Sequence, residues 1–209
     1  AGSFNNNTTS STFLGYDADQ TDQNGYTNSM ALGRSSRFSA NNHVRIGNSS
    51  VFSIGGYASW TDLSDSRFKA DVQENVPGLA FITRLRPVTY HLKINELAAR
   101  LQEDRYRNEK GDFVIATPEA SVKVARDSKQ RLLQTGFIAQ EVEEIAKAIG
   151  YNFSGVDTPE NPNDLYGLRY AQFVVPLVKA VQELNQKSEE QLKMITELKR
   201  EIELLKAKK

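Results

Sequence analysis

The stretch "VVPLVKAVQELNQKSEEQLKMITELKREIELLKAKK" fills residues 174–209 and decides how this end of the chain folds. Its apolar residues recur alternately three and four positions apart, which is the heptad spacing of a coiled-coil helix. Counted from Val174 as an a position, the a and d residues that follow are Leu177, Val181, Leu184, Ser188, Gln191, Ile195, Leu198, Ile202 and Leu205. The pattern predicts one long helix with an apolar seam along one side.

Two interpretations of this helix stay open. Before Gln186 it is read equally well as an amphipathic helix packed on its own domain, whereas beyond Gln186 the pattern favours a self-associating coiled coil. Ser188 and Gln191 interrupt the seam with polar groups that can fix its register. Val or Ile at a with Leu at d favours two strands, so the seam alone does not determine how many chains associate.

Outward from this helix, the chain divides into three parts: residues 1–63, 64–170 and 171–209. The first sixty residues are rich in Asn, Ser, Thr and Gly and contain no lysine or glutamate. An apolar residue followed by glycine recurs there, at Gly15, Gly33, Gly47 and Gly55. These steps, separated by polar turns, predict short strands that neighbouring repeat units or neighbouring chains must complete. The alternative is a disordered polar tail, against which the aromatic residues of this part argue.

The middle part has the mixed pattern of an α+β domain. Residues 78–85 form a short apolar run of helix or strand, and residues 87–94 alternate as a strand does. Residues 111–139 suggest two or three strands with a turn at "RDSKQ" (126–130). Residues 139–150 predict an amphipathic helix that ends at a glycine, and a loop follows at 157–164.

Composition excludes several classes of function. The formal net charge is zero, which gives no support to a nucleic-acid or anionic-membrane partner. There is no cysteine, and His43 and His91 are isolated, so we expect neither a metal site nor a cofactor. No run reaches the roughly 18 apolar residues of a membrane span. The opening "AGSFNNNTTSS" has no signal-peptide pattern, and we expect the chain to be a piece of a longer protein.

One short stretch raises the question of chemistry. "DLSDSRFKADV" (62–72) places Ser64 five positions before Lys69. A serine hydroxyl becomes a nucleophile when a base removes its proton. Lysine acts as that base only when it is neutral, which requires desolvation or a neighbouring positive charge to lower a pKa that is ordinarily about 10.4. Arg67 is a candidate neighbouring charge and Phe68 a candidate for dry packing.

The spacing adds a geometric condition. Five helical residues turn by about 500°, so Ser64 and Lys69 cannot project from one helical face. Ser64 must therefore precede a helix, with the chain folding Lys69 back to it. The alternative is that Ser64 only caps a helix, as Ser and Asp commonly do, while Lys69 is a solvated surface residue.

Four motifs then occur in a familiar order: "SDSRFKADV", "LRPVTYHL", "TGFIAQEVEEI" and "LRYAQFVVPLVKAVQEL". Together, over about residues 60–185, they resemble the C-terminal intramolecular chaperones of phage tailspikes and tail fibres, the endosialidase-chaperone family. The resemblance implies a homotrimeric domain that nucleates folding of an upstream β-shaft. It also implies self-cleavage just before the serine, with Ser64 as nucleophile, Lys69 as base and Leu63–Ser64 as the scissile bond. Asp65 and Arg67 would be supporting residues.

The sequence departs from the family pattern in two places. Asp71 and Val72 stand where the family usually has Asn-Ile. The segment between Tyr90 and Gly136 is long, which we interpret as an insertion. The first part of the chain also resembles the head repeats of trimeric bacterial adhesins and the stalks of phage tail fibres, in which three chains wind into a β-structured shaft.

These observations predict an α+β chain with a trimeric β-shaft or β-repeat segment (1–63), a mixed α/β chaperone and auto-protease domain (64–170), and a C-terminal coiled-coil helix (171–209). The expected partners are two further copies of the chain, its own upstream shaft and a host-surface receptor of the parent protein, without nucleic acid or membrane insertion. The expected location is a virion tail fibre or tailspike, or alternatively a bacterial surface. The alternative function is a non-cleaving trimeric adhesin with an inactive dyad.

Overall fold

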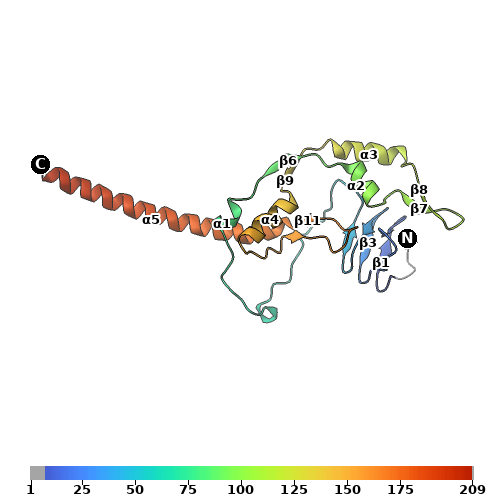
Figure 1. Cartoon of the computed structure of the whole chain (residues 1–209), viewed down its shortest axis with the longest axis horizontal. Coiled ribbons are helices and arrows are strands. Elements are labelled where there is room, and N and C mark those ends of the chain that lie inside the picture. Colours follow the sequence, from blue (N-terminus) through green and yellow to red (C-terminus); the bar gives the residue numbers. More distant parts are fainter. Residues whose placement is uncertain (1–7, 209) are drawn as a thin grey trace. The chain divides into compact units, whose positions relative to one another are not determined.

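The computed structural model describes residues 8–208, which form two compact units. Unit 1 comprises residues 8–63, 88–136 and 158–165, and unit 2 comprises residues 64–87, 137–157 and 166–208. Figure 1 shows the elements of both units along the chain. Their mixed α and β content and the long C-terminal helix confirm that part of the predicted fold class. The trimeric shaft, the coiled coil and the boundaries of the three predicted domains stay predictions.

The first part of unit 1 is a stack of short parallel strands, which we call the β-repeat (residues 8–50). Strands β1 (Thr12–Leu14), β3 (Met30–Leu32) and β5 (Val44–Ile46) form one parallel sheet, and β2 (Asp19–Gln20) pairs in parallel with β4 (Arg37–Phe38). The predicted short strands are therefore confirmed there. Neighbouring coils of one chain complete each ladder. The fourth apolar-glycine step, at Gly55, forms no strand.

The recurring glycines have a steric cause. Gly15 has a φ of +136°, and a Cβ there would lie 2.6 Å from the carbonyl carbon of Gly33 in the next coil. Only glycine allows the coils to approach this closely. Phe13 stacks on Phe38 at a centroid distance of 5.3 Å, and the buried residues of the cluster are Ala18, Tyr26, Ala31 and Phe38.

The rest of unit 1 begins with an antiparallel pair, β6 (Val88–Tyr90) with β9 (Gln134–Gly136). The predicted insertion, residues 91–135, runs from the end of β6 into β9. It contains α2 (Ile94–Arg100), the hairpin of β7 (Arg105–Arg107) and β8 (Phe113–Ile115), and α3 (Ala120–Gln130).

Helix α3 corrects one prediction, because the expected turn at 126–130 is helical. The alternating Val122 and Val124 suggested a strand, but Val124 is 65% exposed. The less exposed positions are instead Val122, Ala125, Arg126, Ser128 and Lys129, of which Val122, Ala125, Arg126 and Lys129 share one face at helical spacing. Arg126 is held by acidic partners elsewhere in the insertion. A long-range ion pair therefore overrides the local pattern.

Unit 2 is built around an aromatic core. Its short elements are α1 (Leu79–Ile82), α4 (Ala139–Ala148), the antiparallel pair β10 (Val156–Asp157) and β11 (Gly167–Leu168), and the 3₁₀ helices η1 (Ser66–Phe68) and η2 (Tyr170–Phe173). Helix α4 confirms the amphipathic helix predicted over 139–150. The buried cluster consists of Phe81, Val142, Ala146, Phe153 and Phe173.

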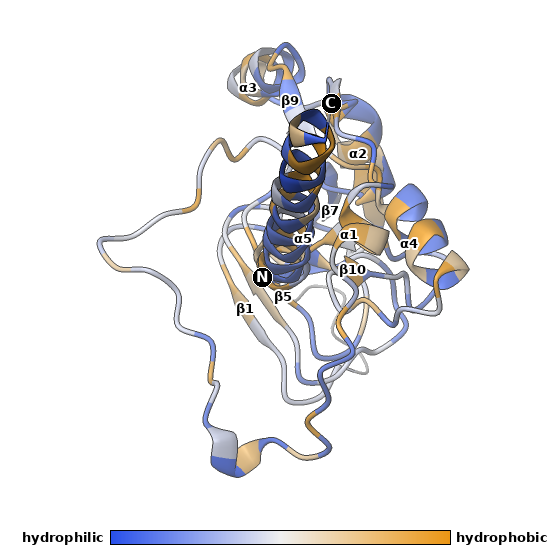
Figure 2. Ribbon diagram, turned by 90° about the vertical axis from the view of Figure 1, so that its left-hand side faces the viewer, coloured by the Kyte–Doolittle hydropathy of each residue, from blue (hydrophilic) through white to orange (hydrophobic). Residues whose placement is uncertain are grey.

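The long helix α5 (Val174–Ala207) packs on unit 2 with only one side of its first turns. Pro176 and Ala180 are buried, and Glu183 Oε2 accepts a hydrogen bond from the backbone N–H of Leu79 at 2.7 Å. The predicted packing of the helix before Gln186 is thus present, but it uses a different face from the seam. Figure 2 shows apolar residues along the length of this otherwise polar helix. The apolar seam residues are all exposed in the single chain, by 44–65%.

No helix within residues 8–208 is long and apolar enough to cross a membrane.

Candidate active site

A 3₁₀ turn brings the predicted serine and lysine together. Helix η1 begins just after Ser64 and Asp65, and Lys69 leaves it in extended conformation, with φ −112° and ψ 127°. This short turn reverses the chain without forming an α-helix, as the five-residue spacing requires. Lys69 Nζ lies 2.7 Å from Ser64 Oγ, within hydrogen-bond distance.

The alternative in which Ser64 caps a helix is wrong. The N-cap of η1 is Asp65, whose Oδ1 accepts a hydrogen bond from the backbone N–H of Arg67 at 2.9 Å. Ser64 is left outside the turn, and Lys69 Nζ is the partner of its hydroxyl. Lys69 is exposed, as that alternative expected.

Asp65 and Arg67 also form an ion pair across the turn. Arg67 Nε and Nη2 donate to Asp65 Oδ2 at 3.0 and 2.6 Å. These hydrogen bonds lower the pKa of Asp65 and raise the pKa of Arg67. Since Asp65 compensates the charge of Arg67, this arginine is a weak candidate for the positive neighbour of Lys69. The pair instead stiffens the turn that separates Ser64 from Lys69.

The whole site is open to solvent in the single chain. Every residue from 52 to 75 is exposed, and Leu63 and Phe68 are exposed by 101% and 85%. Figure 1 shows η1, in the teal part of the chain, on a long stretch without other secondary structure. Within one chain, Phe68 therefore does not shield Ser64 and Lys69 from water. The geometry of a nucleophile and its base is present, but burial is not.

Asp71, which stands where the family pattern has Asn, has a backbone conformation that Asn also adopts readily. Asp71 has a φ of +50°, in the left-handed region. Asn and Asp tolerate this conformation better than other residues with a side chain. Asp71 therefore suits the same local conformation as the usual Asn.

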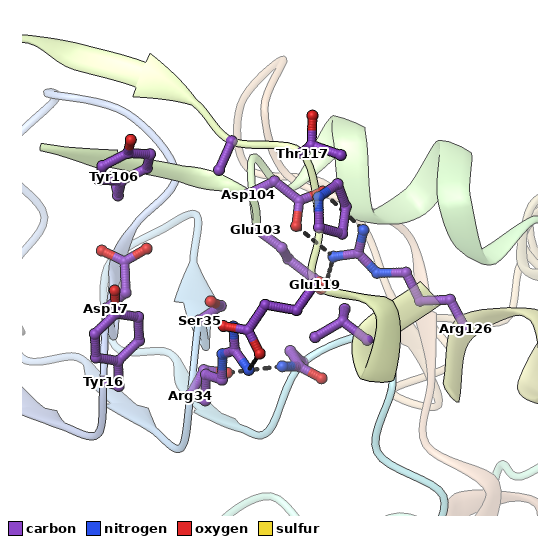
Figure 3. Close-up of a pocket in the computed structure, with 14 residues that line it drawn as sticks. Tyr16, Asp17, Arg34, Ser35, Glu103, Asp104, Tyr106, Thr117, Glu119 and Arg126 are labelled. Carbon is purple, nitrogen blue, oxygen red and sulfur yellow. Dashed lines mark hydrogen bonds and ion pairs between the residues drawn. The ribbon is translucent and has the colours of Figure 1, made fainter. Parts of the chain in front are cut away.

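Unit 1 contains a second polar cluster that the sequence did not single out. Glu103 and Arg126, exposed by 3% and 4%, pair with each other at 3.2 Å, and Arg126 also makes two hydrogen bonds to Asp104 at 2.7 and 2.9 Å. Figure 3 shows these side chains beside a cavity of about 190 Å³. No local signal identifies such a cluster, because residues 103 and 126 lie on different elements.

The acidic and histidine side chains of residues 8–208 form no group of three or more that could hold a metal ion.

Comparison with known proteins bears on this site. Residues 64–151 match the model of a peptidase family whose description is "Chaperone of endosialidase". No curated protein sequence matches the chain. The matched segment begins at Ser64 and includes Lys69. Residues 64–151 therefore match the chaperone-of-endosialidase family, as the first three motifs predicted, whereas the fourth motif, at residues 168–184, lies beyond the matched segment.

Proposed function

We propose that this chain is an intramolecular chaperone that assembles as a homotrimer, folds the β-structure preceding it and then cuts its own Leu63–Ser64 bond. Membership of the family supports the chaperone role and self-cleavage in general. The observation that carries the specific proposal is the 2.7 Å distance between Lys69 Nζ and Ser64 Oγ.

The reaction uses the residue that follows the scissile bond as its nucleophile. Neutral Lys69 takes the hydroxyl proton of Ser64, and Oγ attacks the carbonyl carbon of Leu63. The C–N bond breaks, the departing amine takes the proton from Lys69, and the acyl group is left on Oγ as an ester. Water then hydrolyses the ester, which yields a carboxyl group on Leu63 and restores the Ser64 hydroxyl beside a new amino terminus.

Assembly supplies the missing burial. Lys69 is exposed in the single chain, whereas its proposed role as base requires a neutral amine. Packing of other chains against the exposed segment would desolvate Lys69 and favour its neutral form. Leu63, Phe68 and Val72 provide the exposed apolar surface for such packing. Cleavage would then follow assembly, and loss of the chaperone would leave the shaft kinetically trapped.

The seam of α5 is the proposed site of association. Its apolar residues are exposed along the helix and face away from the contact with α1, which uses Pro176, Ala180 and Glu183. Burying such a seam between chains is the main driving force of a coiled coil. We place the protein in a phage tail fibre or tailspike, with a host-surface receptor as partner of the parent protein.

Intact mass under denaturing conditions tests the proposal. The assembled wild-type chain should yield a fragment that begins at Ser64, whereas Ser64→Ala and Lys69→Ala should remain whole. Ser66→Ala, an exposed serine in the same turn, is the matched control and should be cut like the wild type.

Cleavage that survives the loss of Lys69 would overturn the proposed mechanism. A wild-type trimer that stays uncut would instead favour the second function, a non-cleaving host-recognition module with a silent dyad.

A further inference from the structure

One compact unit contains residues from both sides of the Leu63–Ser64 bond. Unit 1 joins the β-repeat, which precedes the bond, to residues 88–136 and 158–165, which follow it. Cutting the bond therefore removes a covalent link without dividing this unit. The contacts inside unit 1 determine whether the two products separate.

The first of these contacts is made by Glu103 of the insertion. Its Oε1 accepts a hydrogen bond from the backbone N–H of Ser49 at 2.7 Å, and its Oε2 accepts one from Ser49 Oγ at 2.6 Å. Ser49 follows the last strand of the β-repeat. Arg126, which is itself held by two hydrogen bonds to Asp104, donates to Glu103 Oε2 at 3.2 Å (Figure 3). The carboxylate is therefore oriented before it meets Ser49.

Two arginines link the middle of the β-repeat to the same insertion. Arg37 on β4 donates from Nη2 to the backbone oxygen of Arg105 at 2.9 Å. Arg105 in turn donates from Nη2 to the backbone oxygen of Thr21 at 2.7 Å, in the turn after β2. Burial, with the charge of Arg37, lowers the pKa of Arg105 to about 10. Both guanidinium groups are thus largely removed from water by this contact.

The loop 158–165 adds a third set of contacts, at the turn after β4. Asp164 Oδ1 accepts a hydrogen bond from Ser39 Oγ at 2.6 Å, and Asn161 Nδ2 donates to the backbone oxygen of Ser39 at 2.7 Å. Asn163 Nδ2 donates to Asp22 Oδ2 at 2.6 Å. Each of these hydrogen bonds is made to a turn of the β-repeat, so it can form only when that turn is folded.

The hydrogen bonds described above join polar groups. The hydrophobic cluster of the β-repeat consists of its own residues, namely Ala18, Tyr26, Ala31 and Phe38 with Phe13 packed against them, while the insertion has its own buried Ile94 and Ala98. The insertion and the loop contribute carboxylates, guanidinium groups and amides. Polar contacts of this kind are typical of partners that bind specifically yet can separate.

We propose that the insertion (91–135) and the loop 158–165 form the surface by which the chaperone recognises the folded β-repeat, and that this contact outlasts cleavage. The partner is the β-repeat of this chain. The inference rests on the proposed function, and it makes release a second step after the cut.

Retention of the two products tests the inference. The full chain is tagged at its amino terminus, allowed to assemble and cut, captured under native conditions and washed. The fragment that begins at Ser64 should stay bound. Glu103→Ala should speed its release by about tenfold or more, because a buried acceptor of three hydrogen bonds is lost. Glu96→Ala, an exposed carboxylate on α2 of the same insertion, should release like the wild type.

A second, milder variant keeps the inference testable if Glu103→Ala fails to fold. Ser49→Ala removes the hydroxyl donor but keeps the backbone N–H, so release should speed up by less than with Glu103→Ala. Immediate separation of the wild-type products would overturn the inference, as would equal release of the Glu96→Ala and Glu103→Ala fragments.

Failure of self-cleavage can be told apart from failure of this inference. A recognition site for a specific protease is inserted at Gly56, where a side chain would meet no atom within 4 Å, in a Ser64→Ala chain that cannot cut itself. Fragments that stay together after protease treatment support the holding surface whether or not the wild type cuts itself. Fragments that separate overturn it even if the wild type does.

Discussion

The exposed turn at Ser64 and the buried cluster at Glu103 are both built from charged and hydroxyl side chains, yet they differ in almost every physical respect. The turn is made by six consecutive residues and is open to water. The cluster joins residues 49, 103 and 126 and is nearly closed to it. Under the proposed function the turn becomes reactive only when it is buried, whereas the cluster that we propose as a recognition surface is already buried.

The largest expected effect is on the rate of self-cleavage, in a variant that keeps a hydrogen-bond donor at position 69 but removes the base. Lys69→Arg keeps a donor near Ser64 Oγ but stays charged, so self-cleavage should slow by at least about 100-fold. The rate is followed by denaturing electrophoresis after assembly. Lys110→Arg, on an exposed turn, is the control and should cut at the wild-type rate. Normal cutting by Lys69→Arg would contradict a general-base role.

The buried cluster should respond in stability. Arg126→Met leaves Glu103 and Asp104 without their shared cation, which should reduce the free energy of unfolding of unit 1 by about 3 kcal/mol. Urea denaturation measures the change. Arg131→Met, exposed at the end of the same helix, is the matched control. Equal losses in the two variants would show that the cluster contributes no special stability.

The seam of α5 tests whether the exposed turn depends on assembly. Leu198→Lys places a charge at a d position, so light scattering should report loss of the oligomer, and self-cleavage should slow by about tenfold or more. Glu197→Lys adds the same side chain at the neighbouring c position and should leave both properties unchanged. Full-rate cutting by a monomeric Leu198→Lys chain would separate cleavage from assembly.

The smallest effect concerns pH. Burial opposes ionisation of Asp164, but hydrogen bonds from Ser39 and from backbone N–H groups outweigh it and lower its pKa below the ordinary 3.8. A lowered pKa means that the stabilisation is present above about pH 4 and is lost as acid protonates the folded form. The urea midpoint of Asp164→Asn should therefore depend less on pH below about pH 4 than the wild type. Asp112→Asn, an exposed control, should follow the wild type.

Sequence reasoning succeeded where the relevant contacts are local. The heptad spacing predicted a helix that the structure contains as 34 residues, and the apolar-glycine steps predicted strands. The five-residue spacing of Ser64 and Lys69 required a turn, and η1 provides it. The predicted turn at residues 126–130 was wrong. Val122 and Val124 alternate as in a strand, but Arg126 lies in helix α3, where distant carboxylates hold it.

By itself, the sequence determined the long helix, the stacked strands, the family of residues 64–151 and the pairing of Ser64 with Lys69. Each depends on periodicity or on residues a few positions apart, which a linear pattern records. Only the tertiary structure decided that α5 packs with one face and exposes its seam, and that the insertion contacts the β-repeat through Glu103. Those outcomes depend on burial and on partners as much as 104 residues apart, which no local pattern contains.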